Sequence, residues 1–339
     1  MITSPTNFAT PPTPPTLWAW LSLPDSDLDH SDLVAMNLTV AREIPSLSVL
    51  DIPRYCNIVD QWTRQFASVL PEMEAAFHRT PAKWKNDLRF FRVGMLAGFL
   101  GHEIGIRYLE DQKHAQAAHY LNPADLFLNG LIDTRQGTCA SMPTLHVAIA
   151  RRLGWPVSLA SVKSHFISRY DDGEVYHNIE ATNTHPGGFV SNPDEMYIQR
   201  FDLPPKAISS GSDLRRLSTR EMLGVFVAFR ARHFLDSGEM DRADRDYALA
   251  RALIPTHRRT YITAMAPFLH RGSRLFEPKE LEHPNSLPQE LLIPPNPAEQ
   301  GFGPFGALSS TYVISLAKGQ IVPGNPALFS STTITKEQP

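Results

Sequence analysis

Apolar residues recur at three- and four-residue intervals through the first third of the chain. Within residues 53–70, four of them follow one another at four-residue steps and so share one helical face: Ile58, Trp62, Phe66 and Leu70. The segment LRFFRVGMLAGFLGHEIGIRYL, residues 88–109, is so strongly apolar that it is typical of a buried helix. We therefore predict a helical leader over residues 25–120. The Pro/Thr-rich residues 1–24 that precede it are predicted to be a flexible tail.

The pattern changes in the middle of the chain. The segment MPTLHVAIARRLG, residues 142–154, carries an apolar stripe at helical spacing, and Pro143 fits only in the first turn of a helix. A helix is therefore expected to begin near residues 139–141 and to end before Gly154. Three short runs of β-forming residues follow: VSLASV (157–162), HFISRY (165–170) and VYHNIEA (175–181). We predict that the helix and a small antiparallel sheet form an α+β core over residues 121–205.

Helical spacing returns in the last third of the chain. Residues 218–255 predict a helix, an SGE turn and a second helix. Eight of their positions resemble one tetratricopeptide unit: Leu223, Phe226, Phe229, Gly238, Ala243, Tyr247, Ala250 and Pro255. Because one such unit is not stable alone, we expect this tetratricopeptide-like region, residues 206–280, to pack on the core. The Pro-, Gly- and Ser-rich residues 281–339 are predicted to be a disordered tail.

Composition narrows the classes of function. The 339 residues carry a net charge of -3, so no broad basic field points to a nucleic-acid or membrane partner. No stretch approaches the ~20 apolar residues that a membrane-spanning helix needs, and the early run LWAWLSL lacks the basic flank and cleavage site of a signal peptide. The two cysteines, Cys56 and Cys139, make no disulfide framework. We interpret both as free thiols and expect a cytoplasmic protein.

The second and third β runs flank the residues DDGE, a strong hairpin signal. With the turn centred on Asp172 and Gly173, the expected register sets His165 directly opposite Glu180. Directly opposed residues share a face of the sheet, with Cβ atoms ~5 Å apart. A carboxylate at that distance fixes one imidazole nitrogen and leaves the other free for chemistry.

Cys139 stands where the predicted helix begins, and two interpretations of it are open. It is either a small buried apolar residue or a nucleophile whose thiol pKa is lowered by the amides and dipole of the helix start. A nucleophile needs a base within ~3 Å, and the base needs an orienting group. In the expected register His165 and Glu180 supply both. The amides at the helix start, that of Cys139 included, would then hold an oxyanion.

Other polar residues near this arrangement are candidates for auxiliary roles. Asn178 is the alternative orienting group, as in Cys/His/Asn sites, although the expected register sets it opposite Ile167. Gln136 is a candidate oxyanion donor beside Cys139. His146 lies two turns into the helix and is expected on the helix surface. No tight ligand spacing predicts a metal, and we expect no cofactor.

These segments resemble the transglutaminase-like superfamily. GTCASMPTLHVAIARRLGWPVSLASV is similar to that family's cysteine helix and following strand, SHFISRY to its histidine strand, and NIEATN to the strand that carries its acid, usually Asp. The resemblance implies that Cys139 is the nucleophile, His165 the base and Glu180 the orienting acid. LAGFLGHEIGIRYL and NPADLFLNGLIDTRQG resemble the lead-in of a bacterial subgroup that has a helical leader and a tetratricopeptide-like C-terminal region. The resemblance covers residues 30–270.

The resemblance also implies a reaction. The cysteine attacks an amide or related acyl carbonyl, forms a thioester, and passes the acyl group to water or to an amine. A cysteine-dependent amide hydrolase or acyl transferase acting on a peptide or protein is therefore the first hypothesis. The alternative is a catalytically inactive protein that binds a protein partner through its C-terminal helices. The family includes enzymes and non-enzymes, so the fold alone does not decide.

Overall fold

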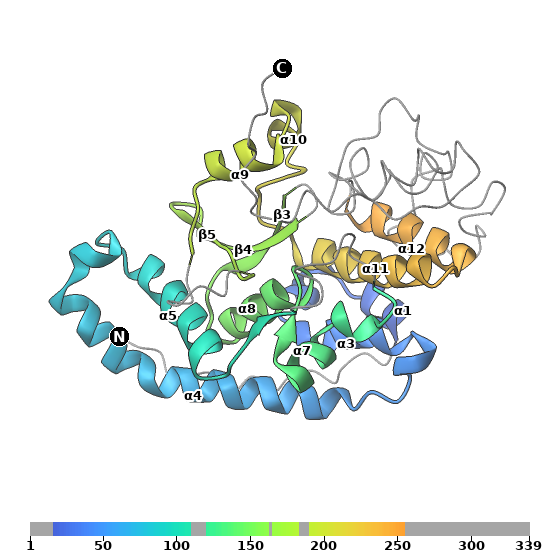
Figure 1. The fold of residues 1–339 in the computed structure, drawn as a ribbon, viewed down its shortest axis with the longest axis horizontal. Helices are drawn as coiled ribbons and strands as arrows, with labels where there is room; N and C mark the ends of the chain where they lie inside the picture. The colour runs from blue at the N-terminus through green and yellow to red at the C-terminus, as the bar shows by residue number, and fades with distance from the viewer. Residues whose placement is uncertain (1–15, 110–119, 163–164, 183–189, 255–339) are drawn as a thin grey trace, which may run out of the picture.

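The computed structural model describes residues 16–109, 120–162, 165–182 and 190–254. Helices make up most of this part, and a three-stranded sheet lies above helix α8 (Ser141–Arg152) in the view of Figure 1. One apolar cluster extends from α1 (Leu17–Leu21) to α12 (Met240–Leu253) and joins the helices to one face of the sheet. A smaller cluster covers the other face. The architecture is therefore α+β, with the sheet enclosed on both sides.

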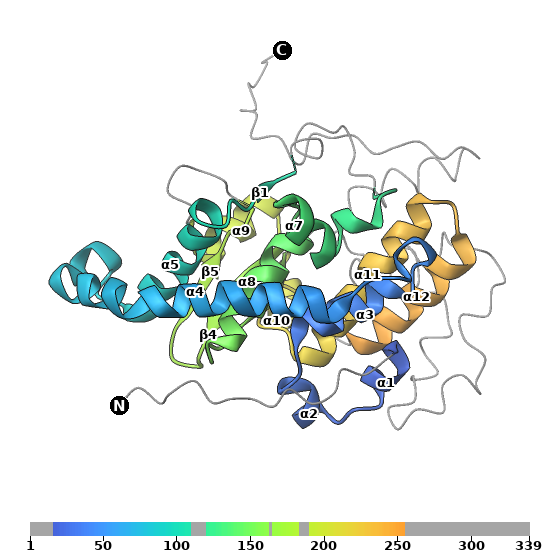
Figure 2. The ribbon, with the colours of Figure 1, turned by 90° about the horizontal axis from the view of Figure 1, so that it is seen from below.

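The N-terminal part of the chain is helical. After α1 come α2 (Asp25–Asp29), α3 (Leu33–Arg42), α4 (Ile52–Arg79) and α5 (Leu88–His102), with 3₁₀ turns at Pro45–Leu47 and Pro81–Trp84. The carboxylate of Asp51 caps α4 by accepting from the N–H of Arg54. Seen from below, α4 runs past α8 (Figure 2), and its residues Trp62 and Phe66 are buried. None of the helices in the described ranges is both long enough and apolar enough to cross a bilayer.

Residues 16–24, predicted to belong to a flexible tail, are folded. The side chain of Thr16 caps α1, and Leu17, Trp20 and Leu21 are at most 3% exposed. The prediction was wrong here because the LWAWL run is apolar enough to pack against the core, although Pro-rich residues precede it. Burying three large apolar side chains contributes roughly 1.5–3 kcal/mol each, which offsets the cost of ordering a short helix. Residues 1–15 lie outside the described residues.

The core contains the predicted helix and three strands. α8 begins at Ser141, within the expected range, and Pro143 lies in its first turn. The strands β3 (Val157–Val162), β4 (His165–Asp171) and β5 (Tyr176–Ile179) form an antiparallel meander in that order. Three elements precede α8 in the chain: a 3₁₀ turn at Pro123–Asp125, α7 (Leu128–Thr134) and β2 (Gln136–Gly137). Strand β2 pairs in parallel with β1 (Arg107–Tyr108). This two-residue ladder was not predicted, because so short a strand has no periodicity to detect.

The hairpin between β4 and β5 differs from the predicted one in its turn. Asp171 pairs with Tyr176, which centres the turn on Gly173 and Glu174, one residue later than expected. The carboxylate of Asp172 explains the difference, because it accepts from the N–H of Glu174 at 3.0 Å and so closes a local Asx turn. Gly173 has a φ of +88°, a conformation that glycine adopts without strain.

The later turn moves the pairing of the two strands by two residues. Asn178 lies opposite Arg169 rather than Ile167. The same register, continued beyond its last pair, Ser168 with Ile179, sets His165 and Glu180 diagonally from each other instead of directly opposite. Diagonal Cβ atoms lie about 7–8 Å apart, which long side chains can still span. Since side chains alternate with a period of two, a two-residue shift leaves every one of them on its predicted face.

The C-terminal helices are α9 (Asp194–Phe201), α10 (Pro205–Ser209), α11 (Thr219–Asp236) and α12. Side chains of α9 and α10 cover the face of the sheet opposite α8. α11 and α12 form the predicted helical pair and pack side by side (Figure 1). Buried Arg230 joins them to α3, with salt bridges of 2.6 Å to Asp246 and to Glu43. Of the predicted tetratricopeptide-like region, everything after residue 254 lies outside the described residues, as does the predicted tail at 281–339.

Two glycines provide a matched test of packing between α11 and α12. A Cβ added at Gly224 of α11 would lie 2.8 Å from Ile254 Cγ1 and from Leu253 Cβ, whereas one added at Gly98 of α5 meets nothing within 4 Å. We expect Gly224→Ala to lower the free energy of unfolding by about 1–3 kcal/mol through overpacking. Gly98→Ala should raise it by up to about 1 kcal/mol through helix propensity. Urea unfolding monitored by circular dichroism measures both, and equal stabilities would contradict the close approach of the two helices.

Candidate functional site

Cys139 occupies the turn that joins β2 to α8. Thr138 organises this turn: its N–H donates to Ser141 Oγ at 3.1 Å, and its hydroxyl accepts from the N–H of Ala140 at 3.2 Å. The same hydroxyl donates to the carbonyl of Asp125 at 3.0 Å. Each of these bonds fixes a residue next to Cys139, so the thiol is held at the start of the helix and is half-buried.

Gly137 allows the close packing behind this turn. A Cβ at this position would lie 2.6 Å from Leu131, 2.7 Å from Met142 and 2.9 Å from Ser141. No side chain fits there without moving α7 or the start of α8. The glycine immediately before Thr138 therefore sets how closely the cysteine turn approaches the rest of the core.

His165 and Glu180 are in direct contact. Nε2 of His165 lies 3.0 Å from both carboxylate oxygens of Glu180, and each residue is 8% exposed. Thr182 holds the acid in place, because its hydroxyl donates to Glu180 Oε1 at 2.6 Å and its N–H donates to the same oxygen at 3.2 Å. The extra methylene of glutamate, relative to aspartate, gives the reach that the diagonal placement requires.

An aromatic wall fixes the plane of the His165 ring. Phe201 of α9 stacks on it, with centroids 6.0 Å apart and ring planes within 11° of each other, and Tyr197 stacks in turn on Phe201. The Tyr197 hydroxyl is buried and has no hydrogen-bond partner of good geometry among the described residues. Burial and the nearby charge of Glu180 raise the pKa of Tyr197, so this hydroxyl stays protonated. α9 thus closes the side of the site away from α8.

The Cys139 thiol lies close enough to the His165 ring to raise the pKa of the imidazole. Since Glu180 occupies Nε2, the ring nitrogen left for the thiol is Nδ1. Burial alone would lower the pKa of His165, but the Glu180 carboxylate and the contact with Cys139 outweigh it and raise that pKa to about 10. Burial likewise opposes ionisation of Glu180, yet His165 and Thr182 hold the pKa of this carboxyl below its ordinary value. The pair is therefore an imidazolium and a carboxylate at neutral pH.

Two tyrosines outside the predicted core elements lie close enough to Cys139 for a charge on its thiol to act on them. Tyr108 pairs with Gly137 across the β1–β2 ladder, and Tyr120 follows the gap in the described chain. Burial raises the pKa of both phenols, and the negative charge of a Cys139 thiolate acts in the same direction. Sequence reasoning missed both residues, because only the parallel pairing of β1 with β2 brings residue 108 beside residue 137.

Helix α11 holds Tyr120 in place. The carboxylate of Asp236 accepts from the N–H of Tyr120 at 2.8 Å, and Nδ1 of His233 lies 2.9 Å from its carbonyl. The guanidinium of Arg232 lies over the Tyr120 ring at 5.5 Å and pairs with Asp236 at 2.9 Å, with both side chains almost wholly buried. The C-terminal end of α11 therefore contacts Tyr120, one of the residues near Cys139.

His146 is buried, which corrects the prediction that it lies on the helix surface. It is 5% exposed, and burial lowers its pKa to about 4 although the charge of Glu180 opposes this. The imidazole is therefore neutral near pH 7. The prediction was wrong because α8 is enclosed on all sides, so that a polar residue away from its apolar stripe still meets protein rather than water.

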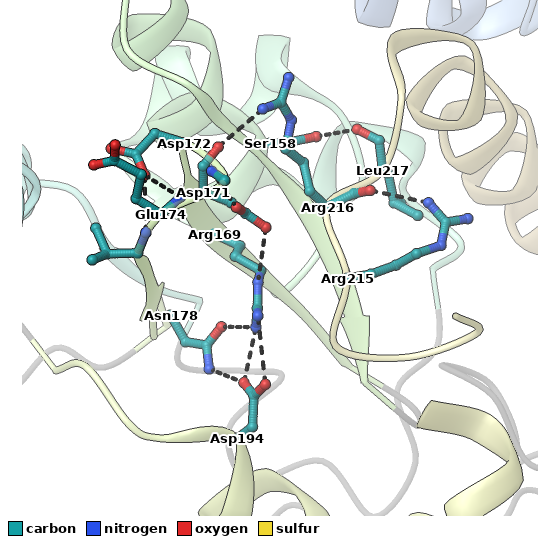
Figure 3. Close-up of polar contacts among 12 residues, drawn as sticks. Ser158, Arg169, Asp171, Asp172, Glu174, Asn178, Asp194, Arg215, Arg216 and Leu217 are labelled. Carbon is teal, nitrogen blue, oxygen red and sulfur yellow. Dashed lines mark hydrogen bonds and ion pairs between the residues drawn. The ribbon is translucent and has the colours of Figure 1, made fainter. Parts of the chain in front are cut away.

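Of the two auxiliary candidates, Asn178 has defined side-chain contacts and Gln136 has none among the described interactions. Asn178 accepts from Arg169 at 2.8 Å and donates to Asp194 at 2.6 Å, so its amide belongs to a buried Arg–Asn–Asp cluster (Figure 3). It contacts neither His165 nor Cys139 among the described interactions. Gln136 lies half-buried in β2, three residues before the cysteine, and no described contact fixes its amide.

Within the described ranges, no group of three or more His, Cys, Asp or Glu side chains is placed to hold a metal ion. The second cysteine, Cys56, lies in α4 beside Asp32, with Sγ 4.0 Å from the carboxylate. Burial and the negative charge of Asp32 raise the pKa of Cys56 to about 12. This thiol therefore stays protonated at neutral pH and has no place in the site.

Residues 59–224 match the family model described as the transglutaminase-like superfamily. Comparison with curated proteins and with solved structures gave no match. The matched segment contains the cysteine turn, α8, all three strands of the sheet and the aromatic wall of α9. This part of the chain, with Cys139, His165 and Glu180 in it, belongs to the transglutaminase-like superfamily.

Proposed function

We propose that this protein is a cysteine-dependent amide hydrolase or acyl transferase. The observation that supports the proposal is the contact of His165 with the Glu180 carboxylate at 3.0 Å, together with the effect of the nearby Cys139 thiol on the pKa of His165. A nucleophile, a base and a group that orients the base are the three parts that acyl transfer through a cysteine requires. Membership of the superfamily agrees with this chemistry, because many of its members use a catalytic cysteine.

The reaction has two halves that share these residues. The Cys139 thiolate attacks an amide carbonyl carbon, and the protonated Nδ1 of His165 gives its proton to the departing amine as the carbon–nitrogen bond breaks. This leaves a thioester on Cys139 and a neutral imidazole. His165 then takes a proton from water or from a primary amine as this nucleophile attacks the thioester carbon. The carbon–sulfur bond breaks, which releases the acid or a new amide and restores the Cys139 thiolate beside the protonated imidazole. Glu180 keeps Nε2 paired throughout.

The start of α8 supports stabilisation of the oxyanion. No described residue accepts a hydrogen bond from the Cys139 N–H, and the group stands where the positive end of the helix lies. A carbonyl oxygen held there would gain charge during attack, which is when a preorganised donor contributes most. We give hydrolysis preference over transfer, because no described residues mark out a site for an acceptor amine. A peptide or protein is the substrate class that suits the proposal.

The first test compares the two cysteines. A panel of glutamine-containing peptides is incubated with the protein, with and without a fluorescent primary amine, and the products are read by mass spectrometry. We expect Cys139→Ala to abolish both hydrolysis and amine incorporation, and Cys56→Ala to retain the activity of the parent protein. Hydrolysis alone identifies an amidase, and incorporation identifies a transferase. Activity that survives Cys139→Ala would reject the proposal.

Alkylation tests the state of the thiol without a substrate. At pH 7 iodoacetamide should modify Cys139 in the native protein and leave Cys56 unmodified, because a thiol with a pKa of about 12 has only about 10⁻⁵ of its population as thiolate. His165→Ala should slow the reaction of Cys139 about tenfold or more. Peptide mass spectrometry reads both sites. If Cys139 reacts only after unfolding, the nucleophilic role is excluded, and the inactive interaction module is favoured.

Glu180 is tested by two substitutions and one matched control. Glu180→Gln removes the charge that raises the pKa of His165, so the imidazolium should lose its proton well below pH 10, and turnover should fall about 10²–10⁴-fold. Glu180→Asp should also retain little activity, since the shorter side chain should not reach Nε2 of His165. Glu174→Gln, on the same hairpin but largely exposed, should change neither rate nor pH profile. Full activity of Glu180→Gln would show that the acid does not orient the base.

A further inference from the structure

A second site is suggested by a cavity far from Cys139, at the other end of α8. The cavity measures about 470 Å³ and lies where α8 ends, β3 begins and α11 begins. Its volume is within the range of small-molecule pockets. Arg151 stands near the end of α8, twelve residues after Cys139, so that the length of the helix, about 18 Å, separates the two places.

Two of the guanidinium groups that line this cavity have no carboxylate partner. Arg151 donates to the backbone carbonyl of Asp29 at 2.6 Å and to the hydroxyl of Thr219 at 3.1 Å. Arg216 donates to the backbone carbonyl of Asp171 at 3.0 Å (Figure 3). All of these acceptors are neutral groups, and neither arginine forms a salt bridge with another described residue. Other described arginines, such as Arg54 and Arg230, pair with an acid.

The acids of the cavity are already engaged. Glu221 binds the guanidinium of Arg215 through both carboxylate oxygens and also accepts from the N–H of Ser218 at 2.8 Å. The carboxylate of Asp29 accepts from the Thr219 hydroxyl at 2.6 Å. Three arginines and two acids line the cavity, which leaves an excess of one positive charge.

The surroundings add to this positive field. α11, a helix of 18 residues, begins at Thr219 on the rim and directs its positive end toward the cavity. Burial lowers the pKa of Arg151, the negative charge of Asp29 opposes this, and the positive charge of Arg216 acts in the same direction as burial, so the two guanidinium groups are close enough to repel each other. An anion between them would remove that repulsion. Trp155 and Met222 supply an apolar surface beside the charged groups.

We propose that this cavity binds a small molecule through a phosphate or carboxylate group held by Arg151 and Arg216. Both ligand types present the same chemistry, a compact oxyanion that accepts several charge-assisted hydrogen bonds. The apolar body of the ligand lies against Trp155. The proposal does not rest on the activity of Cys139, and it holds for an enzyme and for an inactive relative alike.

Calorimetric titration of the full chain tests the site. One arm uses inorganic phosphate and the other succinate, each against sodium chloride at matched ionic strength. At least one anion should bind saturably with a dissociation constant of about 1 mM, and Arg216→Gln should weaken it about tenfold, the effect of losing one charge-assisted hydrogen bond. Arg216 is exposed, so the substitution should not disturb folding, which circular dichroism verifies.

The control removes the same charge elsewhere. Arg54 lies on the exposed side of α4 and is paired with Asp133. The Arg54→Gln variant should bind the anion as the parent protein does. Saturation by phosphate alone identifies a phosphorylated ligand, and saturation by succinate alone identifies a carboxylate ligand. Absence of saturable binding in both arms overturns the proposal. So does equal weakening by Arg54→Gln and Arg216→Gln, because that result reflects overall charge and not a site.

Discussion

The hydrogen bond between Nε2 of His165 and the carboxylate of Glu180 is the contact on which the arrangement of the site depends. Both groups are almost completely buried, so each needs the other in order to carry its charge. The bond ties β4 to the segment after β5, while Ser168 of β4 donates to the carbonyl of Pro143 in the first turn of α8. The strand that carries the base is thereby fixed both to its acid and to the helix of the cysteine.

The C-terminal helices contribute to the same region from the opposite side. α11 is buried along almost its whole length, and its last turn holds the backbone of Tyr120 through Asp236 and His233. The helical pair α11 and α12, predicted to be tetratricopeptide-like, is part of the core, since it shares an apolar cluster with α3 and α8. Because the residues of α11 are buried on all sides, this helix leaves little surface exposed.

Periodicity and turn chemistry predicted the elements of the site well. The start of α8, the position of Pro143 and the three strands follow from residue patterns that act over a few positions. The exact pairing of β4 and β5 did not follow, because the side chain of Asp172 selected a turn one residue later than the DDGE sequence favoured. The tyrosines beside Cys139 and the burial of His146 were also missed, since they depend on contacts between segments that are distant in the sequence.

The diagonal relation of His165 and Glu180 links two properties that are usually considered separately, the length of the acid and the geometry of the hairpin. With the turn as it stands, the register continued from Ser168 and Ile179 sets position 180 diagonally from the ring, and the two methylenes of glutamate span that distance. A hairpin whose turn closed one residue earlier would set the same position directly opposite the histidine, where an aspartate would suffice. In such a scaffold a change at the tip of the hairpin and a change of acid would have to occur together, although the two positions do not touch.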